Sequence, residues 1–388
     1  MSTGPAISPA FQPVHDHPGD PQQPTEGIAL CMSGGGYRAM LFHLGTLWRL
    51  NELHYLPKLD RVSSVSGGSI TNGVLAMNWK NLGFDGNGFA QNFDQQVTQP
   101  IRRMASQSID VSSILEGIFG GISKHVADHY NKFLYNHAKL KDLPDNGQGP
   151  RFVFNATSLQ TGVLWRFSKP YMGDWKVGLV RNPDVELATA VAASSAFPPV
   201  LSPCVLQLDP NSFDKSIPPA PGITLPDFRK QAVLADGGVY DNLGLETAWK
   251  QNKTVLVSNG GGALGPEADP KHDWISQINR VLLVVYNQVV TLRVRDIVEL
   301  YQLKVRDGSY WGIGSNIQNY QLSNALVCPF DFTTKLAETA TRLTALDNTT
   351  QQQLIDWGYA ICDAGMRRWV LPTAPAPAQS PYGTFKKP

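Results

Sequence analysis

The sequence VSSVSGGSI at residues 62–70 predicts a strand that ends in a tight elbow and leads into a helix. Apolar and small residues alternate as far as Val65, and apolar residues at helical spacing follow over residues 71–77. A serine at such an elbow presents its hydroxyl at the carboxyl end of the strand, where the N–H groups of the following helix face the same point. Ser66 is therefore the first candidate nucleophile.

Small residues surround Ser66, as an elbow requires. Gly67 and Gly68 remove side chains that would collide with the neighbouring strand or helix. The common form of the motif is G-x-S-x-G, and Ser64 stands where that form has its first glycine. A serine there carries a steric cost if the backbone needs a positive φ. Taken alone, the stretch fits plain packing as well as it fits catalysis.

A glycine loop lies upstream of the elbow. An apolar run over residues 27–32 predicts a buried strand, SGGG at residues 33–36 predicts a loop, and residues 37–50 have helical spacing. Glycine N–H groups at a helix N-terminus suit a phosphate or a developing oxyanion, although a simple tight turn has the same composition. The loop lacks the Lys-Ser/Thr ending of a P-loop, and Ala39 replaces the last glycine of G-x-G-x-x-G, so it gives little support to nucleotide binding.

A second decisive stretch, AVLADGGVYDN, occupies residues 232–242. Its apolar part predicts a strand that carries Asp236 at its carboxyl end, where open α/β sheets assemble their sites. Gly237 and Gly238 clear the space beside the carboxylate. A turn with no further role is the alternative, because Asp-Gly is frequent in turns.

Strands and helices alternate along the rest of the chain, which predicts an α/β fold. The expected strands occupy residues 152–157, 162–167, 254–258 and 281–286, and the expected helices occupy residues 186–196, 289–306 and 349–370.

The pattern predicts one domain between two loose ends. Residues 1–26 contain six prolines and no apolar periodicity, which predicts a flexible arm. Residues 27–371 form the expected domain, with a helical insertion near residues 89–145. Residues 372–388 are rich in proline and alanine and are expected to form a flexible tail.

Within the insertion, an apolar stripe is interleaved with glycines, which cost helix stability. These residues are Ile114, Leu115, Ile118, Phe119 and Ile122, with Gly117, Gly120 and Gly121 between them. An ordinary buried helix is favoured over a lid or a membrane-facing segment. His125 and His129 have the spacing of metal ligands, but no third ligand is suggested and a solvated face is favoured.

The composition argues against several classes of protein. A net charge of +1 with 17% charged residues provides no broad attraction to nucleic acid. The four cysteines are far apart and form no C-x-x-C pair, which argues against a zinc site and a disulfide scaffold and favours a reducing compartment. No secretory signal and no run of about 18 apolar residues is visible. We expect a cytoplasmic protein whose membrane contact is peripheral.

Three glycine-flanked strand ends follow one another: SGGGYR at residues 33–38, Ser66, and DGG at residues 236–238. This series resembles the patatin-like phospholipases, and the form SGGGYRA is also similar to the cytosolic phospholipase A group. The resemblance covers residues 27–245 and includes an alanine-serine helix with a Phe-Pro-Pro exit at residues 190–199. It implies an α/β three-layer sandwich with a mostly parallel central sheet.

The resemblance implies a serine lipid acyl hydrolase of the phospholipase A type, which cleaves ester bonds of glycerophospholipids through an acyl-enzyme. Ser66 is the implied nucleophile and Asp236 its general base, without a histidine. A carboxylate can act as this base if partial burial and low hydration raise its basicity. Membrane phospholipids are the implied substrate, and the scheme needs neither a metal nor a cofactor.

The same resemblance implies a role for the glycine loop. The backbone N–H groups of Gly34, Gly35 and Gly36 form the implied oxyanion hole, which stabilises charge that exists only in the transition state. Arg38 is implied to steady the loop or to bind a substrate phosphate. The two departures from the family's pattern, at positions 39 and 64, concern local geometry rather than the dyad.

A Ser-Asp-His triad is the nearest alternative, because chain order permits His272 to be the base. Residues 266–273 are polar and contain prolines, which predicts an exposed loop for this histidine. His43 is the other histidine expected near the same end of the sheet.

Two further alternatives concern regulation and turnover. A membrane-degrading effector that is switched on by a nucleotide signal would use the same chemistry. Its regulatory site would involve a basic helix with Arg293, Arg295, Lys304 and Arg306, for which a solvated face is favoured. A catalytically weak lipid-binding module would result if Ser64 distorted the elbow.

Overall fold

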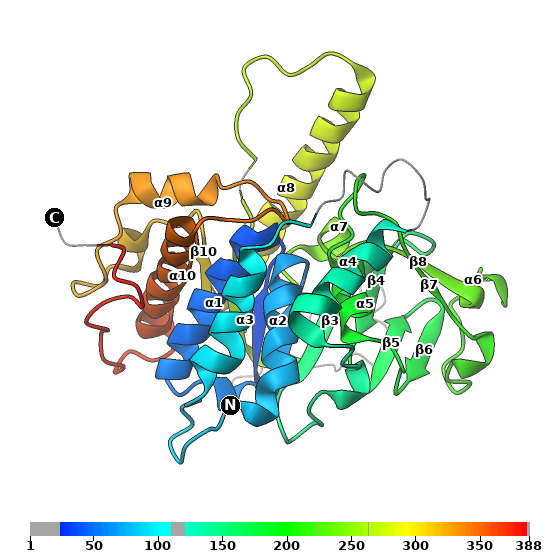
Figure 1. Cartoon of the computed structure of the whole chain (residues 1–388), viewed down its shortest axis with the longest axis horizontal. Helices are drawn as coiled ribbons and strands as arrows, with labels where there is room; N and C mark the ends of the chain where they lie inside the picture. The colour runs from blue at the N-terminus through cyan, green and yellow to red at the C-terminus, as the bar shows by residue number, and fades with distance from the viewer. Residues whose placement is uncertain (1–23, 110–120, 224, 263, 386–388) are drawn as a thin grey trace.

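The computed structural model describes residues 24–109, 121–223, 225–262 and 264–385. In this part of the chain, ten strands form one sheet with helices on both faces (Figure 1). The main strand order is β10-β9-β1-β2-β3-β4-β5-β6, and β8 pairs with both β3 and β7. The expected α/β three-layer architecture is confirmed.

The strands are β1 (Thr25–Met32), β2 (Arg61–Ser64), β3 (Arg151–Ser158), β4 (Leu164–Phe167), β5 (Tyr171–Asp174), β6 (Gly178–Arg181), β7 (Cys204–Gln207), β8 (Gln231–Asp236), β9 (Asn252–Asn259) and β10 (Asp307–Gly312). The α-helices are α1 (Gly36–Glu52), α2 (Gly67–Asn78), α3 (Gln99–Ala105), α4 (Ile122–Tyr130), α5 (Leu187–Ser194), α6 (Asp227–Lys230), α7 (Gly238–Asp241), α8 (Trp274–Gln302), α9 (Phe330–Ala337) and α10 (Asn348–Trp369).

The sheet has a parallel part that contains the elbow. Strands β10, β9, β1, β2 and β3 pair in parallel, whereas β4 to β8 pair antiparallel with their neighbours. Parallel strands end at the same edge of a sheet, so the loops after β1, β2 and β9 meet there. This edge brings the glycine loop and the elbow together.

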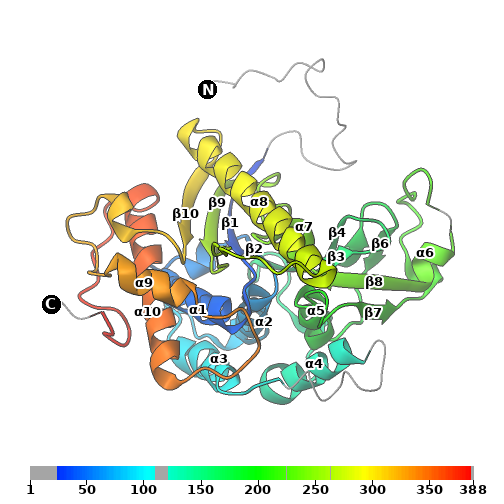
Figure 2. The ribbon, with the colours of Figure 1, turned by 90° about the horizontal axis from the view of Figure 1, so that it is seen from above.

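Alternate residues of β1 face the two helical layers, as the period of a strand requires. Leu30 and Met32 belong to the core under α1, α2 and α10, while Ala29 and Cys31 belong to a smaller core under α8. Figure 2 shows α8 crossing the parallel strands on the face opposite α1 and α10. The continuous apolar run of this strand therefore reflects burial on both faces.

Two glycines allow α1 and α10 to cross closely. A Cβ added at Gly45 would collide with the carbonyl oxygen of Ile355, and a Cβ added at Gly358 would collide with the carbonyl oxygen of Phe42. The helix predicted over residues 349–370 is confirmed as α10, and its close fit to α1 fixes the helix that begins at the glycine loop.

One predicted segment is wrong. The strand expected over residues 281–286 and the helix expected over 289–306 are instead the single helix α8. A short run of valine and leucine is compatible with either a buried strand or a helix, so its periodicity does not decide between them. Asp273 gives the missed signal, because its side chain accepts a hydrogen bond from the Ser276 N–H at 2.9 Å and caps the helix.

Both chain ends differ from the expectation within the described residues. Strand β1 begins at Thr25, inside the expected arm, and residues 1–23 lie outside the described part. Within the expected tail, residues 372–385 are described and contact α10. The Asp356 carboxylate accepts hydrogen bonds from the Tyr382 N–H at 2.9 Å and the Thr384 N–H at 2.8 Å, and so ties this segment down.

The expected helical insertion contains α3 and α4, with residues 110–120 between them outside the described part. Most of the apolar and glycine stripe over residues 114–122 therefore lies outside the structure described here. No three metal-binding side chains gather anywhere in the described ranges, the neighbourhood of His125 and His129 included. Over the same ranges, no helix combines the length and the apolar composition that a bilayer span requires.

Candidate active site

The elbow has the predicted form. Ser66 lies between β2 and α2 with φ 50° and ψ −121°, a strained conformation for a residue with a side chain. A Cβ at Gly67 would collide with the carbonyl oxygen of Gly36, and one at Gly68 would lie 2.5 Å from that of Met32. Glycine is therefore required at both positions, and the strain is held by close backbone packing on each side.

Ser64 fits the elbow without the steric cost that its position suggested. It is the last residue of β2 and has no positive φ. Its hydroxyl lies 2.9 Å from the Ser69 hydroxyl and accepts a hydrogen bond from the Asn72 side chain at 2.8 Å. The serine thus takes part in a buried polar cluster beneath α2.

Asp236 is the last residue of β8 and is 2% exposed. The Gly238 N–H donates a hydrogen bond to its carboxylate at 2.7 Å, and the Ser66 hydroxyl lies close enough to interact with the same carboxylate. Burial raises the pKa of Asp236 to about 7, although both interactions act to lower it. A carboxylate that titrates near neutrality is able to take a proton from a hydroxyl at neutral pH.

Strand β3 brings Asp236 to the elbow. One part of β3 pairs in parallel with β2, with Phe154 opposite Ser64, and the next part pairs antiparallel with β8, with Ala156 opposite Asp236. The Thr157 hydroxyl donates a hydrogen bond to the Asp236 carbonyl oxygen at 2.8 Å. The nucleophile and the carboxylate therefore lie at the same edge, carried by two neighbours of one strand.

The glycine loop lies directly beside the elbow. A Cβ added at Gly34 would lie 3.0 Å from the Ser66 Cβ. Gly35 and Gly36 have φ of 144° and 61°, which only glycine adopts readily. Their N–H groups make no hydrogen bond to any described residue.

Gly34 differs from the expectation. Its N–H donates to the carbonyl oxygen of Asn242 at 3.1 Å and to the side-chain oxygen of the same residue at 3.2 Å. This N–H is engaged within the protein, so Gly34 shapes the loop, whereas Gly35 and Gly36 keep free donors.

Arg38 is buried and folds back behind the loop. Its Nε donates to the Gly260 carbonyl oxygen at 3.1 Å, and its Nη1 donates to the Thr339 carbonyl oxygen at 2.5 Å. Burial lowers the pKa of this guanidinium to about 10. Of the two roles expected for Arg38, these contacts support the steadying of the loop rather than the binding of a phosphate.

His43 is fully buried beneath the loop. Its Nε2 lies 2.9 Å from the Ser33 carbonyl oxygen, which only accepts, so Nε2 carries the proton. Burial lowers the pKa of His43 to about 4, and the neutral ring accepts at Nδ1 from the Ser258 hydroxyl at 2.9 Å. His43 thus supports the residue at which the loop begins.

His272, unlike His43, is exposed to solvent. Its side chain is 87% exposed, and its nearest acidic partner is Asp269 at 3.9 Å. The loop predicted around this histidine is exposed, as expected.

Two supporting residues were missed in the sequence. Besides Asn242, the Ser194 hydroxyl accepts the Ser66 N–H at 3.0 Å and donates to the Asn155 carbonyl oxygen at 2.6 Å. The predicted alanine-serine helix and the stretch DGGVYDN contain these residues, but periodicity does not reveal which side chains contact the elbow or the loop.

A comparison with protein families identifies the family of this chain. The sequence model of the family described as Patatin-like phospholipase matches residues 30–249, more than half of the chain. The chain belongs to this family. The match contains the glycine loop, the elbow and Asp236 in the order predicted from the sequence.

Three solved structures are similar to this patatin-like phospholipase at low identity. Human GIVD cytosolic phospholipase A2 has a TM-score of 0.48 and 11% identity, with 88% of this chain and 61% of that chain covered. Its complex with methyl gamma-linolenyl fluorophosphonate has a TM-score of 0.49 and 13% identity, with 88% of this chain and 58% of that chain covered. VipD from Legionella pneumophila has a TM-score of 0.34 and 15% identity, with 87% of this chain and 66% of that chain covered. The chain thus spans about three fifths of the length of the human protein. A comparison with curated protein sequences finds no match.

Residues outside the matched family segment also contact the site of this patatin-like phospholipase. Thr339 accepts a hydrogen bond from Arg38, and the Arg342 carbonyl oxygen accepts the Tyr37 N–H at 3.0 Å. A Cβ at Gly36 would lie 2.6 Å from the same Arg342 oxygen. The carboxyl-terminal third therefore covers the outer side of the glycine loop.

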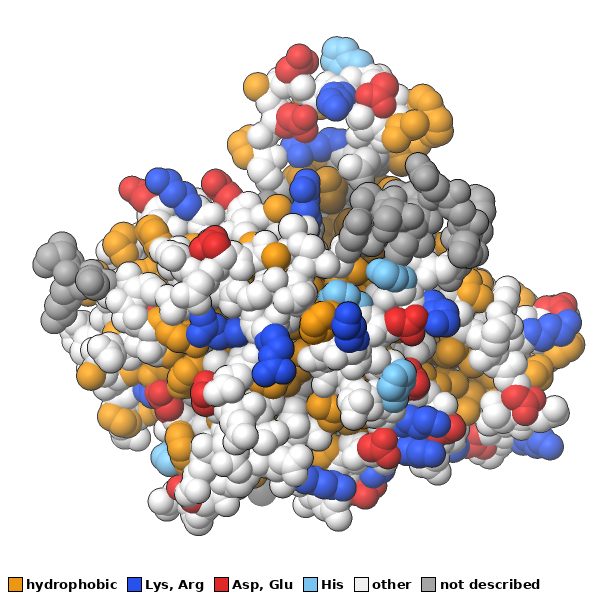
Figure 3. Space-filling model, in the orientation of Figure 1, with side chains coloured by type: hydrophobic (Ala, Val, Ile, Leu, Met, Phe, Trp, Pro, Cys, Tyr) orange, Lys and Arg blue, Asp and Glu red, His pale blue; other side chains and the backbone are white. Residues whose placement is uncertain are grey.

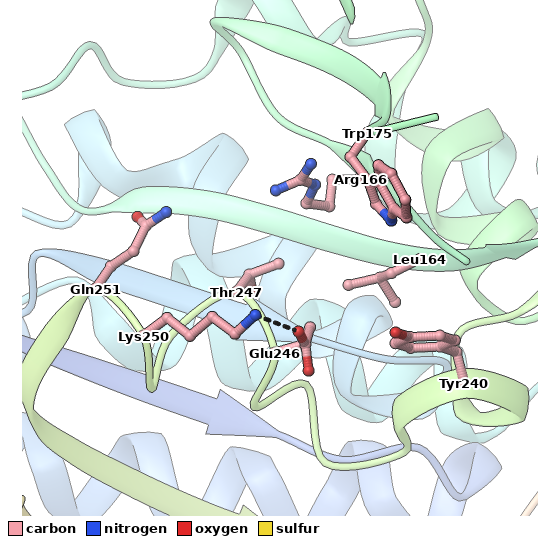
Figure 4. A pocket seen from close by; sticks show the side chains of 8 residues that line it. All are labelled: Leu164, Arg166, Trp175, Tyr240, Glu246, Thr247, Lys250 and Gln251. Carbon is pink, nitrogen blue, oxygen red and sulfur yellow. Dashed lines mark ion pairs between the residues drawn. The ribbon is translucent and has the colours of Figure 1, made fainter. Parts of the chain in front are cut away.

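A cavity shown in Figure 4 lies apart from these residues. Its lining comes from β4, from α7 and from the residues before β9, and Figure 4 marks the ion pair of Lys250 with Glu246 at 3.2 Å. Neither Ser66 nor Asp236 lines it. This cavity is not the candidate active site.

Proposed function

We propose that this patatin-like phospholipase cleaves ester bonds of glycerophospholipids with a catalytic dyad of Ser66 and Asp236. One observation carries the proposal: Ser66, at a strained elbow, lies beside a buried carboxylate that interacts with its hydroxyl and has a pKa of about 7. A serine hydroxyl is a poor nucleophile until a base takes its proton, and this carboxylate is the base that we assign.

The proposed reaction has two halves. Asp236 takes the proton of Ser66 as the oxygen attacks the ester carbonyl carbon, and it returns that proton to the departing alcohol, which leaves an acyl-enzyme. In the second half, Asp236 takes a proton from water, the hydroxide attacks the acyl carbon, and the proton passes to Ser66 as the fatty acid leaves. The ionised carboxylate is the active form, so the buried environment sets the pH at which the reaction begins.

The proposed oxyanion hole uses the N–H groups of Gly35 and Gly36. These donors are unengaged by the described residues and lie beside the elbow, whereas the Gly34 N–H is bound by Asn242. Fixed donors stabilise the tetrahedral oxyanion without reorganisation, and the loss of one such donor typically costs about a hundredfold or more in rate. Arg38, His43 and Asn242 act as positioning residues for this loop.

No specific observation favours the two remaining alternatives. Arg293, one of the basic residues considered for a nucleotide, is paired with Glu246 at 3.2 Å and Asp241 at 3.7 Å. Ser64 ends its strand without distortion, which removes the reason for a catalytically weak module.

A labelling experiment tests the dyad directly. The purified chain is incubated with a fluorophosphonate probe and with a mixed phospholipid extract, and the products are identified by mass spectrometry. We expect labelling of Ser66 and release of fatty acid and lysophospholipid, both absent in Ser66→Ala. Labelling of a different residue, or equal product release by Ser66→Ala, would contradict the proposal.

A further inference from the structure

The amino-terminal half of α8 exposes an unusual number of apolar side chains. Each of seven large hydrophobic residues in this half is at least half exposed: Trp274, Ile275, Ile278, Val281, Leu282, Val284 and Val285. We call this set the α8 face. Figure 1 shows that this part of the helix projects from the body, and Figure 3 shows hydrophobic side chains at the edges of the projection, beside charged ones. Exposed apolar area of this extent marks a surface that another phase or molecule covers.

Polar side chains of this half of α8 form hydrogen bonds and an ion pair with the segment before the helix. Arg280 donates to the Gly265 carbonyl oxygen at 2.9 Å and lies 3.6 Å from the Glu267 carboxylate, and Gln277 donates to the His272 carbonyl oxygen at 3.0 Å. The preceding segment thus makes polar contacts with Arg280 and Gln277, while the seven apolar side chains of the α8 face stay exposed.

The α8 face carries no charge. Arg280 is the only charged residue between positions 274 and 292, and its side chain donates to the segment before the helix. An α-helix rises about 1.5 Å per residue, so the α8 face, from residue 274 to residue 285, extends for roughly 17 Å.

The same surface leads to the candidate active site. Tyr286, the next residue along α8, lies against the loop after Asp236, since a Cβ at Gly238 would be 3.2 Å from its ring. The ring of Tyr286 also packs edge-on against Phe197 at 6.3 Å. Phe197 and Val239 are themselves exposed, so apolar side chains continue from α8 to the approach to the dyad.

We propose that the α8 face docks into the outer layer of a phospholipid bilayer and delivers the ester of a bilayer lipid to Ser66. This inference rests on the proposed function, because it takes a phospholipid as the substrate. A second copy of the chain is the competing occupant, but its coverage would extend over Phe197 and Tyr286 and obstruct the approach to the dyad. A lipid layer covers the same residues and supplies substrate there.

Because the face is uncharged, its binding depends on apolar burial rather than on counter-ion attraction. Zwitterionic vesicles therefore suffice, and binding is insensitive to ionic strength, unlike the binding of basic amphipathic helices. This separates the α8 face from any basic patch elsewhere on the molecule.

The experiment measures flotation of the full chain, with Ser66→Ala to prevent turnover, on phosphatidylcholine vesicles. Leu282→Gln is the test variant and Leu303→Gln its matched control, because Leu282 lies in α8, Leu303 directly follows the last residue of the same helix, and the two are 57% and 64% exposed. The two positions are separated by roughly 31 Å along the helix. We expect Leu282→Gln to weaken partitioning about tenfold and Ile275→Gln with Leu282→Gln to weaken it further, with Leu303→Gln unchanged. Equal effects of the test and the control, or loss of binding in high salt, would overturn the inference.

A fluorescent label locates the contact independently of affinity. The four native cysteines are buried, so a cysteine introduced as Ile278→Cys can be labelled selectively with an environment-sensitive dye, with Leu303→Cys as the control. We expect a blue shift on vesicles only at position 278. A blue shift at 278 without vesicles, together with a concentration-dependent dimer in sedimentation, would assign the face to a second copy and overturn the proposal.

Hydrolysis of a soluble short-chain ester by the unsubstituted chain separates this inference from the proposed function. Ester hydrolysis without vesicle binding of the Ser66→Ala chain would overturn the α8 proposal and leave the dyad intact. Vesicle binding without ester hydrolysis would overturn the dyad and support the α8 face as a lipid contact.

Discussion

The elbow at the end of β2 and the amino-terminal half of α8 are held by the fold in opposite ways. At the elbow, Gly67 lies against Gly36, and the Ser66 N–H is bound by Ser194. Along the projecting part of α8, the segment before the helix provides the hydrogen bonds and the ion pair to Gln277 and Arg280 within the described residues, through its backbone carbonyls and Glu267. A strained backbone at a reacting group must be held in place by many surrounding contacts. A surface that enters a lipid bilayer instead needs exposed apolar area without fixed protein partners.

The largest expected effect tests whether the tightly held region carries the chemistry. Ser66→Ala and Asp236→Asn should each lower the rate of hydrolysis of a soluble ester by about ten-thousandfold, as the loss of an activated nucleophile or its base does. The two residues act as one unit, so the double variant should be scarcely worse than either single one. Steady-state kinetics provide the measurement, and strongly additive losses would argue against a shared step.

The next effect tests the close packing itself. Gly67→Ala should reduce turnover by about a hundredfold or more, because its Cβ would collide with the Gly36 carbonyl oxygen and displace the glycine loop from the nucleophile. Gly86→Ala is the matched control, since a Cβ there has no atom within 4 Å. Circular dichroism and kcat are measured for both, and normal turnover in Gly67→Ala would show that the elbow tolerates movement.

A smaller effect is expected behind the loop. Arg38→Lys keeps the charge but loses the planar fork that spans the carbonyls of Gly260 and Thr339, so at least one of these hydrogen bonds is lost. We expect a loss of about 1–2 kcal/mol of stability and about a tenfold fall in kcat. Thermal unfolding and kinetics on the same preparation provide the check, and full retention of both would remove any bidentate role.

The burial of Asp236 predicts a pH dependence of activity and of stability. Activity should rise with pH through an apparent pKa near 7, as the carboxylate ionises. Between about pH 4 and pH 7 the native state holds this proton more tightly than the unfolded chain, so the free energy of unfolding falls as pH rises. Asp236→Asn lacks this term, and its stability relative to the unsubstituted chain should increase by about 3–4 kcal/mol from pH 4 to pH 8.

Denaturant unfolding at several pH values measures that difference. A constant stability difference across the range would mean that the carboxylate is not desolvated in the native state.

The smallest effect belongs to the loosely held region. His272→Ala should change the hydrolysis of a soluble ester by less than about threefold, against the roughly ten-thousandfold loss expected for a triad base. The reason is its position, because this side chain is 87% exposed beside α8 and contacts neither dyad residue. A large loss of kcat with unchanged thermal unfolding would contradict the dyad.

Some parts of the fold and of the candidate site were predictable from the sequence, and others were not. The strand, elbow and helix around Ser66 were predictable, because glycine and serine at a strand end leave few conformations. The run over residues 281–286 was misassigned, because valine and leucine suit a buried strand as well as a helix. The engagement of the Gly34 N–H by Asn242 was not predictable, since it joins residues 208 positions apart.

The crossing of α1 and α10 has a consequence for where the catalytic unit ends. The family match stops at residue 249, yet α10 presses its backbone at Gly358 onto Phe42, within the helix that starts at the glycine loop. Strands β9 and β10 also lie beyond that boundary; β9 pairs with β1, and β10 pairs with β9. A fragment trimmed to the matched segment would expose one side of α1 and one edge of β1 together. The folded unit that holds the glycine loop in place is therefore larger than the segment by which the family is recognised.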